Sequence, residues 1–239
     1  MSLYQFDSNA QVKLLRLGQQ QTPLLLIDQA MSGLDALLQQ AYAADYTQDG
    51  HSMYPGVRAA LPRDYVLAML QPLYPLLYQV YQIPQHLRLR PKDSYFSLLT
   101  TPESQLQPLQ CLPHFDSTAP YFFAMLHYLS PGPHGGTGFF RHQPTGLERI
   151  CAAQQQRYFA AAQQYFDQHG APPQRYQVAS DPQFELYQPL EYRQNRLLIY
   201  PGNLLHSSLV QPQRDLSADP TAGRLTANIF LNFEAVSSD

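Results

Sequence analysis

The chain has 239 residues, 44% of them hydrophobic, which is long enough to bury one substantial core, and no low-complexity linker divides it. Lys and Arg number 15 against 18 Asp and Glu, giving a net charge of −3 without any basic run, so nucleic acid and anionic membranes are poor candidate partners. The start of the chain lacks the pattern of a signal peptide and no window is apolar enough to span a bilayer, so we expect one cytoplasmic domain, residues 1–239.

The composition also favours one fold class. Cys111 and Cys151 show no CxxC spacing, which fits a reduced compartment and gives no sign of a zinc site. The 21 prolines and 17 tyrosines favour short elements and strands. We therefore expect a β-rich fold with flanking helices.

The first third of the chain predicts two strands and then two helices. Residues 11–28 hold two short apolar runs typical of strands, and residues 30–46 carry apolar side chains at helical spacing. The second helix is expected to break and restart at Pro72 and Pro75. We expect these N-terminal helices, about 30–82, to cover one face of a sheet.

The middle of the chain predicts further strands and one helical segment. Residues 87–101 read as a strand, and 121–129 are apolar throughout, as in a strand buried on both faces. A Gly-rich turn, 130–138, precedes a strand that starts at FFRH. Residues 145–170, rich in Ala and Gln, predict a helical insertion.

The last third returns to strand-like runs, which are QFELYQPL, RLLIYPGNLLHSSLV and RLTANIFLNF. Many short strands with flanking helices predict a mainly β fold of the α+β class. The expected core is a double-stranded β-helix, or jelly roll, whose mouth can hold a ligand.

One short motif predicts a metal site. His114 and Asp116 in PHFDS are two residues apart, so on a strand both side chains would leave the same face. His206, which ends an apolar run, is the best candidate for a third ligand. Two imidazoles and a carboxylate leave coordination positions open, as in non-heme iron(II) oxygenases. An HxD pair alone is weak evidence for a metal site. Arg224 and Thr226 add support, because they are two residues apart and would share one face of the final strand.

These motifs together resemble a known family, the iron(II)- and 2-oxoglutarate-dependent oxygenases, and within it the prolyl-hydroxylase-like branch. The resemblance covers most of the chain, and the segments that carry it are TPLLLIDQAM, PHFDS, HYLSPGPHGGTGFF, NRLLIYPGNLLHSS and GRLTANIFLNF. With YPGVRA near residue 54, the chain looks most similar to a bacterial subgroup of the branch that has no assigned reaction.

The resemblance implies cofactors and roles for particular residues. The implied ligands of iron(II) are His114, Asp116 and His206, and the implied 2-oxoglutarate-binding residues are Arg224, Thr226 and Tyr128. A guanidinium offers the paired donors that a carboxylate accepts, so Arg224 would hold the distal carboxylate of 2-oxoglutarate. The implied reaction consumes O2, converts 2-oxoglutarate to succinate and hydroxylates a small molecule, an amino acid or a peptide side chain.

The chain departs from the family pattern in two places. Arg224 lies 18 residues after His206, a long connection that a hairpin loop would accommodate. If this loop is not a hairpin, Arg196 is the fallback, although its place at the start of a strand favours a structural ion pair. The 145–170 insertion could act as a lid or as a dimer surface. The favoured interpretation is an outer helix that covers the sheet.

Three other histidines have simpler interpretations. His127 alternates with Tyr128, so it should face away from the site as a hydrogen-bonded core residue. Either His134 or His142 could contact substrate, but exposed polar positions explain both more simply. Two alternatives to the oxygenase stay open: a cupin-like metal enzyme that uses no 2-oxoglutarate, and a non-catalytic jelly roll that binds a small molecule or a partner protein. The sequence leaves the substrate and the oligomeric state undetermined.

Overall fold

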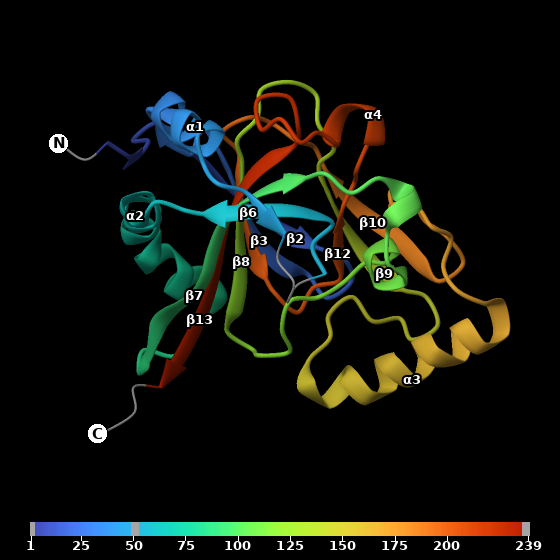
Figure 1. Ribbon diagram of the computed structural model, residues 1–239. Helices are drawn as coiled ribbons and strands as arrows, with labels where there is room; N and C mark the ends of the chain where they lie inside the picture. Colours follow the sequence, from blue (N-terminus) through green and yellow to red (C-terminus); the bar gives the residue numbers. More distant parts are fainter. Residues whose placement is uncertain (1–2, 49–52, 236–239) are drawn as a thin grey trace.

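The computed structural model describes residues 3–48 and 53–235, in which helices flank two main antiparallel sheets (Figure 1). In chain order the elements are β1 (Gln5–Phe6), β2 (Gln11–Leu17), β3 (Thr22–Asp28), β4 (Met31–Ser32), α1 (Leu34–Tyr42), β5 (Thr47–Gln48), β6 (Gly56–Ala60), α2 (Arg63–Tyr81), β7 (Leu87–Leu99), two 3-10 turns (Glu103–Gln105 and Pro108–Cys111), β8 (Phe122–Tyr128), β9 (Thr137–His142), α3 (Ala152–His169), β10 (Phe184–Leu190), β11 (Leu197–Pro201), β12 (His206–Ser208), α4 (Pro212–Asp215) and β13 (Leu225–Ala235). The mainly β class with flanking helices is as the sequence predicted.

The large sheet has the strand order β2-β3-β11-β8-β13-β7-β6-β5 within the described residues. Its middle is the pairing of β8 with β13, in which Tyr128 lies opposite Thr226 and Phe122 opposite Asn232. Six of the seven β8 residues are buried, since both faces of this strand are covered. This confirms the prediction made from its continuous apolar run.

Helices α1 and α2 cover one face of the large sheet, on the left in Figure 1. Leu37 of α1 and Leu73 of α2 belong to the same apolar cluster as Met125 of β8 and Ile229 of β13. Amphipathic helices of this length are only marginally stable alone. Burial of these side chains against the sheet therefore stabilises α1 and α2.

The predicted break in the second helix is wrong. Helix α2 runs without interruption through Pro72 and Pro75. Both prolines lie on the exposed side, while Leu73 and Leu77 stay buried against the sheet. The packed apolar side therefore outweighs the lost hydrogen bonds.

The small sheet, in the order β10-β9-β12, packs on the other face of the large sheet. Phe139 of β9 and Leu190 of β10 share an apolar cluster with Leu126 of β8 and Leu198 of β11. The molecule thus has a helical layer, a large sheet and a small sheet, and the functional residues described below lie between the two sheets.

The run from Arg196 to Val210, expected as one strand, is two strands in different sheets. Strand β11 belongs to the large sheet and β12 to the small one. The chain turns between them at Gly202 and Asn203, because the Pro-Gly-Asn sequence after β11 favours a turn over an extended strand.

Helix α3 packs against the small sheet through one buried side chain. Tyr158 joins an apolar cluster with Phe140 of β9 and Phe184 of β10, and its ring lies 5.0 Å from the His142 ring. The predicted helical segment is therefore present, and its role as an outer helix, a lid or a dimer surface stays a prediction. Among the described residues no helix combines the length and apolar character needed to cross a membrane.

Candidate metal centre

His114 and His206 lie opposite each other on adjacent backbone segments. The N–H of His114 donates to the carbonyl oxygen of His206 at 2.9 Å, and the N–H of His206 donates to that of His114 at 2.8 Å. Opposed residues of an antiparallel pair send their side chains to the same face, and the two ring centroids are 4.3 Å apart. The strand predicted at this motif is only an isolated bridge, but the bridge gives the same orientation.

Asp116 is positioned by the turn between β11 and β12. Its backbone N–H donates to the carbonyl oxygen of Gly202 at 2.6 Å. A side chain on Gly202 would come within 2.5 Å of the Phe122 ring and 3.3 Å of the Asp116 Cβ. Only glycine allows this close approach, so the PGN turn places the carboxylate beside the two histidines.

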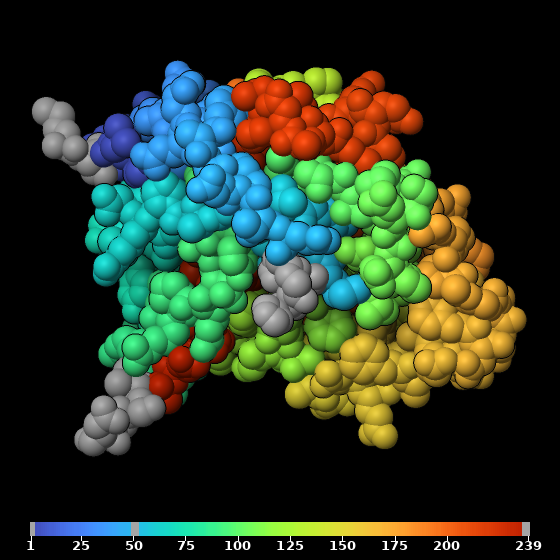
Figure 2. Space-filling view, viewed as in Figure 1, coloured from blue at the N-terminus to red at the C-terminus, as the bar shows by residue number. Residues whose placement is uncertain are grey.

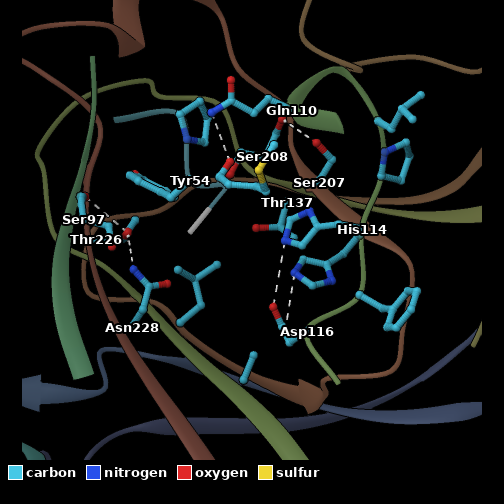
Figure 3. A pocket seen from close by; sticks show the side chains of 18 of the residues that line it. Tyr54, Ser97, Gln110, His114, Asp116, Thr137, Ser207, Ser208, Thr226 and Asn228 are labelled. Carbon is cyan, nitrogen blue, oxygen red and sulfur yellow. Dashed lines mark hydrogen bonds and ion pairs between the residues drawn. The ribbon is translucent and has the colours of Figure 1, made fainter. Parts of the chain in front are cut away.

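The three side chains converge on one point. Asp116 Oδ1 lies 3.9 Å from His114 Nε2, and Asp116 Oδ2 lies 3.9 Å from His206 Nε2. These separations are too long for hydrogen bonds, and the candidate ligand atoms all lie within 4.8 Å of one another. Figure 3 shows His114 and Asp116 turned toward each other in the pocket. No other group of this kind occurs among the described residues.

The protonation states suit a cation between these groups. His206 Nδ1 donates to the Leu204 carbonyl oxygen at 2.9 Å, which leaves the lone pair on Nε2. Burial lowers the pKa of His206 to about 4 and raises the pKa of Asp116 to about 6. Within the described part of the chain, the buried Asp116 Oδ2 has no hydrogen-bond partner. A divalent metal bound between the two imidazoles would supply the partner that this buried oxygen lacks.

The triad opens into a cavity of about 520 Å³ between the two sheets. This volume is in the range of small-molecule sites. The His114 side chain is 58% exposed, whereas that of His206 is 8% exposed, so the centre can be reached from the His114 side. Asp116 is the only acidic residue among the described residues that line the cavity.

Arg224 lines the same cavity and is fully buried. Its Nε donates to the carbonyl oxygen of Gly135 at 2.7 Å, and its guanidinium lies 5.5 Å from the centre of the Tyr128 ring. The Asp215 carboxylate in turn accepts a hydrogen bond from the backbone N–H of Gly135. The guanidinium is therefore held by the Gly135 carbonyl oxygen and the Tyr128 ring, with Asp215 fixing Gly135, and it keeps a buried positive charge beside the cavity.

The expectation of a hairpin between His206 and Arg224 is wrong, because β12 and β13 belong to different sheets. The connection crosses between the sheets and includes α4. Arg224 nevertheless reaches the cavity. Arg196 instead forms an ion pair with Asp28, with 2.6 Å between Arg196 Nε and Asp28 Oδ1. This confirms the interpretation of Arg196 as a structural ion-pair residue.

Thr226 and Tyr128 occupy different places relative to the cavity. Thr226 lines it and accepts a hydrogen bond from Asn228 Nδ2 at 2.9 Å. Tyr128 is fully buried beneath Arg224 and is not among the described residues that line the cavity. Its hydroxyl bonds to Thr137 Oγ1 at 2.6 Å, and Thr137 does line the cavity.

Of the three other histidines that the sequence analysis interpreted, two differ from expectation. His127 is a buried core residue bonded to Tyr65 Oη and Asn195 Oδ1, as predicted. His134 is not exposed: its side chain is 7% exposed and pairs with the buried Asp215 at 3.0 Å. His142 is completely buried. Both lie under later segments of the chain, α4 and α3, whose positions the local sequence does not reveal.

Several further polar residues of the cavity have no role predicted from the sequence, among them Arg58, Ser97 and Asn228. Figure 3 shows Ser97 and Asn228 beside Thr226, on the side of the pocket away from His114. Asn228 follows Thr226 by two residues on β13, so strand alternation could have identified it. The Arg58 guanidinium lies over the rings of Tyr54 and Tyr95, at 5.0 and 4.6 Å from their centres.

Comparison with protein families identifies the chain at the family level. A family model described as "Family of unknown function (DUF6445)" matches residues 8–231. The chain belongs to the DUF6445 family. A search of curated proteins finds no match to this DUF6445 chain.

The DUF6445 chain is also similar to solved structures of two Streptomyces proteins. One is HygX from Streptomyces hygroscopicus with nickel and 2-oxoglutarate bound, at 15% identity and a TM-score of 0.47, covering 90% of this chain and 87% of HygX. Another is AviO1 from Streptomyces viridochromogenes Tue57, at 9% identity and a TM-score of 0.43, covering 96% of this chain and 91% of AviO1. With likeness at this level, the activity of the DUF6445 chain has to be argued from its own site.

Proposed function

We propose that the chain is an iron(II)- and 2-oxoglutarate-dependent oxygenase that hydroxylates a small molecule, an amino acid or a peptide side chain. The observation that carries this proposal is the convergence at one accessible cavity of His114, His206 and the Asp116 carboxylate, whose buried Oδ2 has no hydrogen-bond partner in the described part of the chain. Two imidazoles and one carboxylate form the ligand set of non-heme iron(II) oxygenases. When bound, the iron would supply the redox chemistry that couples oxidation of 2-oxoglutarate by O2 to oxidation of a substrate C–H bond.

The protein residues around the triad have positioning roles in this proposal. Arg224 would bind the distal carboxylate of 2-oxoglutarate, because it is a buried cation fixed at the wall of the same cavity. Thr226 would add a hydroxyl donor by turning its proton away from the Ser97 carbonyl oxygen, which accepts it at 3.5 Å in the protein without ligand. Tyr128 would act indirectly, by supporting the Arg224 guanidinium with its ring and holding Thr137 with its hydroxyl.

The fold agrees with this proposal in its architecture. The large and small sheets pack face to face, and the chain changes from one to the other between β11 and β12. We assign the two sheets to a double-stranded β-helix core in a single domain, with the triad at the open end of the sandwich. Helices α1 and α2 and the α3 segment are additions to that core.

Metal-dependent binding and turnover of 2-oxoglutarate test the proposal. In the full-length protein, 2-oxoglutarate should raise the melting temperature further after Mn²⁺ is added, because ligands that bind only the folded state stabilise it. With Fe²⁺ and O2, the protein should form succinate. His206→Ala should abolish both effects.

Two results would redirect the proposal. Metal binding without any stabilisation by 2-oxoglutarate would favour a cupin-like enzyme. A protein that binds no divalent metal would be a non-catalytic binding protein. Surface variant Arg193→Lys is the matched control, since the Arg193 side chain is 60% exposed and forms a salt bridge with the exposed Glu191.

A further inference from the structure

Exposed apolar side chains gather at the mouth of the metal cavity. Met53, Leu109 and Phe159 are 49%, 60% and 50% exposed, and all three line the cavity. They are three of the eight large apolar residues that are exposed in the described part of the chain. One exposed apolar residue needs no explanation, but several around one opening mark a binding surface.

These residues come from three segments outside the sheets' core strands. Leu109 lies in the second 3-10 turn, Phe159 in α3, and Met53 just before β6. Figure 2 shows the corresponding light-blue, green and golden segments on one face of the molecule. We call Met53, Leu109, Phe159 and the neighbouring Phe115 the apolar collar.

Aromatic rings extend the collar toward the metal centre. The Phe115 ring lies 6.2 Å from the Phe159 ring and 5.9 Å from the Tyr158 ring, measured between centroids. Phe115, His114 and Asp116 all line the cavity, so the collar and the candidate ligands share one cavity. Tyr176 also lines the cavity, but its hydroxyl donates to the Thr101 carbonyl oxygen at 2.6 Å, which leaves the ring as its free surface.

The polar side chain of Gln110, which follows Leu109 in the sequence and also lines the cavity, is already used within the protein. Gln110 Oε1 accepts from the backbone N–H of Gln107 at 2.7 Å, and Gln110 Nε2 donates to the carbonyl oxygen of Met53 at 3.2 Å. The amide therefore joins the Leu109 turn to the Met53 segment. A polyhydroxylated ligand at the collar would lose hydration without gaining this partner.

Other residues that line the cavity have the reverse character. Ser97, Thr226 and Asn228 lie together on the side away from His114 (Figure 3), Arg224 also lines the cavity, and this is where the proposed function places 2-oxoglutarate. One cavity thus combines a polar and cationic group of side chains, the triad and the apolar collar. Its volume of about 520 Å³ suits a small molecule.

We propose that the substrate carries an aromatic or bulky aliphatic group that binds in the apolar collar, next to the metal centre. This inference rests on the proposed function, because the bound molecule is a substrate only if the protein is that enzyme. The apolar collar itself is present in the metal-free protein. Burial of the apolar group between Phe159, Leu109 and Phe115 provides the affinity and aims the attached carbon toward the triad.

Binding of 2-naphthol to the full-length, metal-free protein tests the collar. Phe159→Ser and Leu109→Ser should each raise the Kd of 2-naphthol at least fivefold, measured by fluorescence titration. Val12→Ser should leave the Kd unchanged, because Val12 is 45% exposed on β2, outside the cavity. Methyl α-D-glucopyranoside should not compete. Equal Kd values in all variants, or displacement of 2-naphthol by the glucoside, would overturn the proposal.

A second measurement locates the probe and separates the two proposals. In protein loaded with Mn²⁺, the NMR signals of bound 2-naphthol should broaden, and Phe159→Ser should remove the broadening. If Mn²⁺ binds and no such broadening occurs, the collar proposal fails while the proposed function stands. If Mn²⁺ does not bind but the collar variants weaken 2-naphthol, the proposed function fails and the apolar site stands.

Discussion

The backbone N–H of Arg224 donates to the carbonyl oxygen of Asp215 at 2.9 Å. The carboxylate of Asp215 also accepts from the N–H of Gly135, whose carbonyl oxygen accepts from Arg224 Nε. Burial alone would raise the pKa of Asp215, but His134 and the N–H groups of Gln211 and Gly135 outweigh it and lower the pKa. An ionised Asp215 therefore links the crossover after β12 to the guanidinium at the cavity wall.

Asp215→Asn should loosen Arg224 without touching the metal ligands. We expect the Kd of 2-oxoglutarate for the Mn²⁺-loaded protein to rise about tenfold and the free energy of unfolding to fall by about 2 kcal/mol, as for loss of buried charged hydrogen bonds. Isothermal titration and urea unfolding measure the two effects. A fall in stability with unchanged 2-oxoglutarate affinity would show that Asp215 has only a structural role.

Arg224→Lys tests the cosubstrate site directly. Lysine keeps the charge but loses the planar pair of donors and the bond to Gly135, so we expect the Kd of 2-oxoglutarate to rise roughly 10 to 100-fold. The Mn²⁺ affinity should not change. Titration of both ligands into the variant and into the Arg193→Lys control checks this. An unaltered Kd for 2-oxoglutarate would remove Arg224 from the site.

Much of the fold follows from local sequence patterns. Strands β2 and β3 were predicted because short apolar runs alternate with turn residues, and β8 because its apolar run has no polar interruption. Continuity of α2 through Pro72 could not be predicted, because it depends on packing against a sheet formed by distant segments.

In the candidate site, too, local sequence predicts some features, while others depend on segments that are distant in the sequence. His114 and Asp116 share a face by their spacing alone, and His206 was found as the end of an apolar run. The exact pairing of His114 with His206 and the close contact of Asp116 with Gly202 depend on how β12 leaves the large sheet. The burial of His134 was missed because its partner, Asp215, lies in a crossover that resembles a hairpin loop in the sequence.

The Asp28–Arg196 pair should contribute to stability far more than an exposed pair. Its side chains are 15% and 7% exposed, with 2.6 Å between Oδ1 and Nε. Asp28→Asn should lower the free energy of unfolding by about 3 kcal/mol, because it leaves a buried guanidinium without its counterion. Glu234→Gln, which breaks the exposed pair with Lys92, should cost less than about 1 kcal/mol. Urea unfolding of both variants makes the comparison, and equal losses would contradict it.

Stability should fall as the pH drops below the ordinary pKa of histidine. Burial lowers the pKa of His127 to about 4 from 6.5, so between these values the unfolded state binds the extra proton. From pH 6.5 to pH 5 this residue should cost on the order of 2 kcal/mol of unfolding free energy. His127→Gln should show a weaker decline in urea unfolding over this range. A parallel decline in both proteins would assign the pH dependence to other groups, among them His142, whose pKa burial also lowers to about 4.

The central claim is that His114, Asp116 and His206 together hold one divalent metal. Anaerobic titration of the metal-free protein with Mn²⁺, followed by electron paramagnetic resonance of the free ion, tests it most directly. The wild-type protein should bind one ion per chain, and Asp116→Asn and His206→Ala should each weaken binding at least 100-fold, while Arg193→Lys binds as the wild type does. Equal Mn²⁺ affinity in the wild type and in both ligand variants would contradict the account.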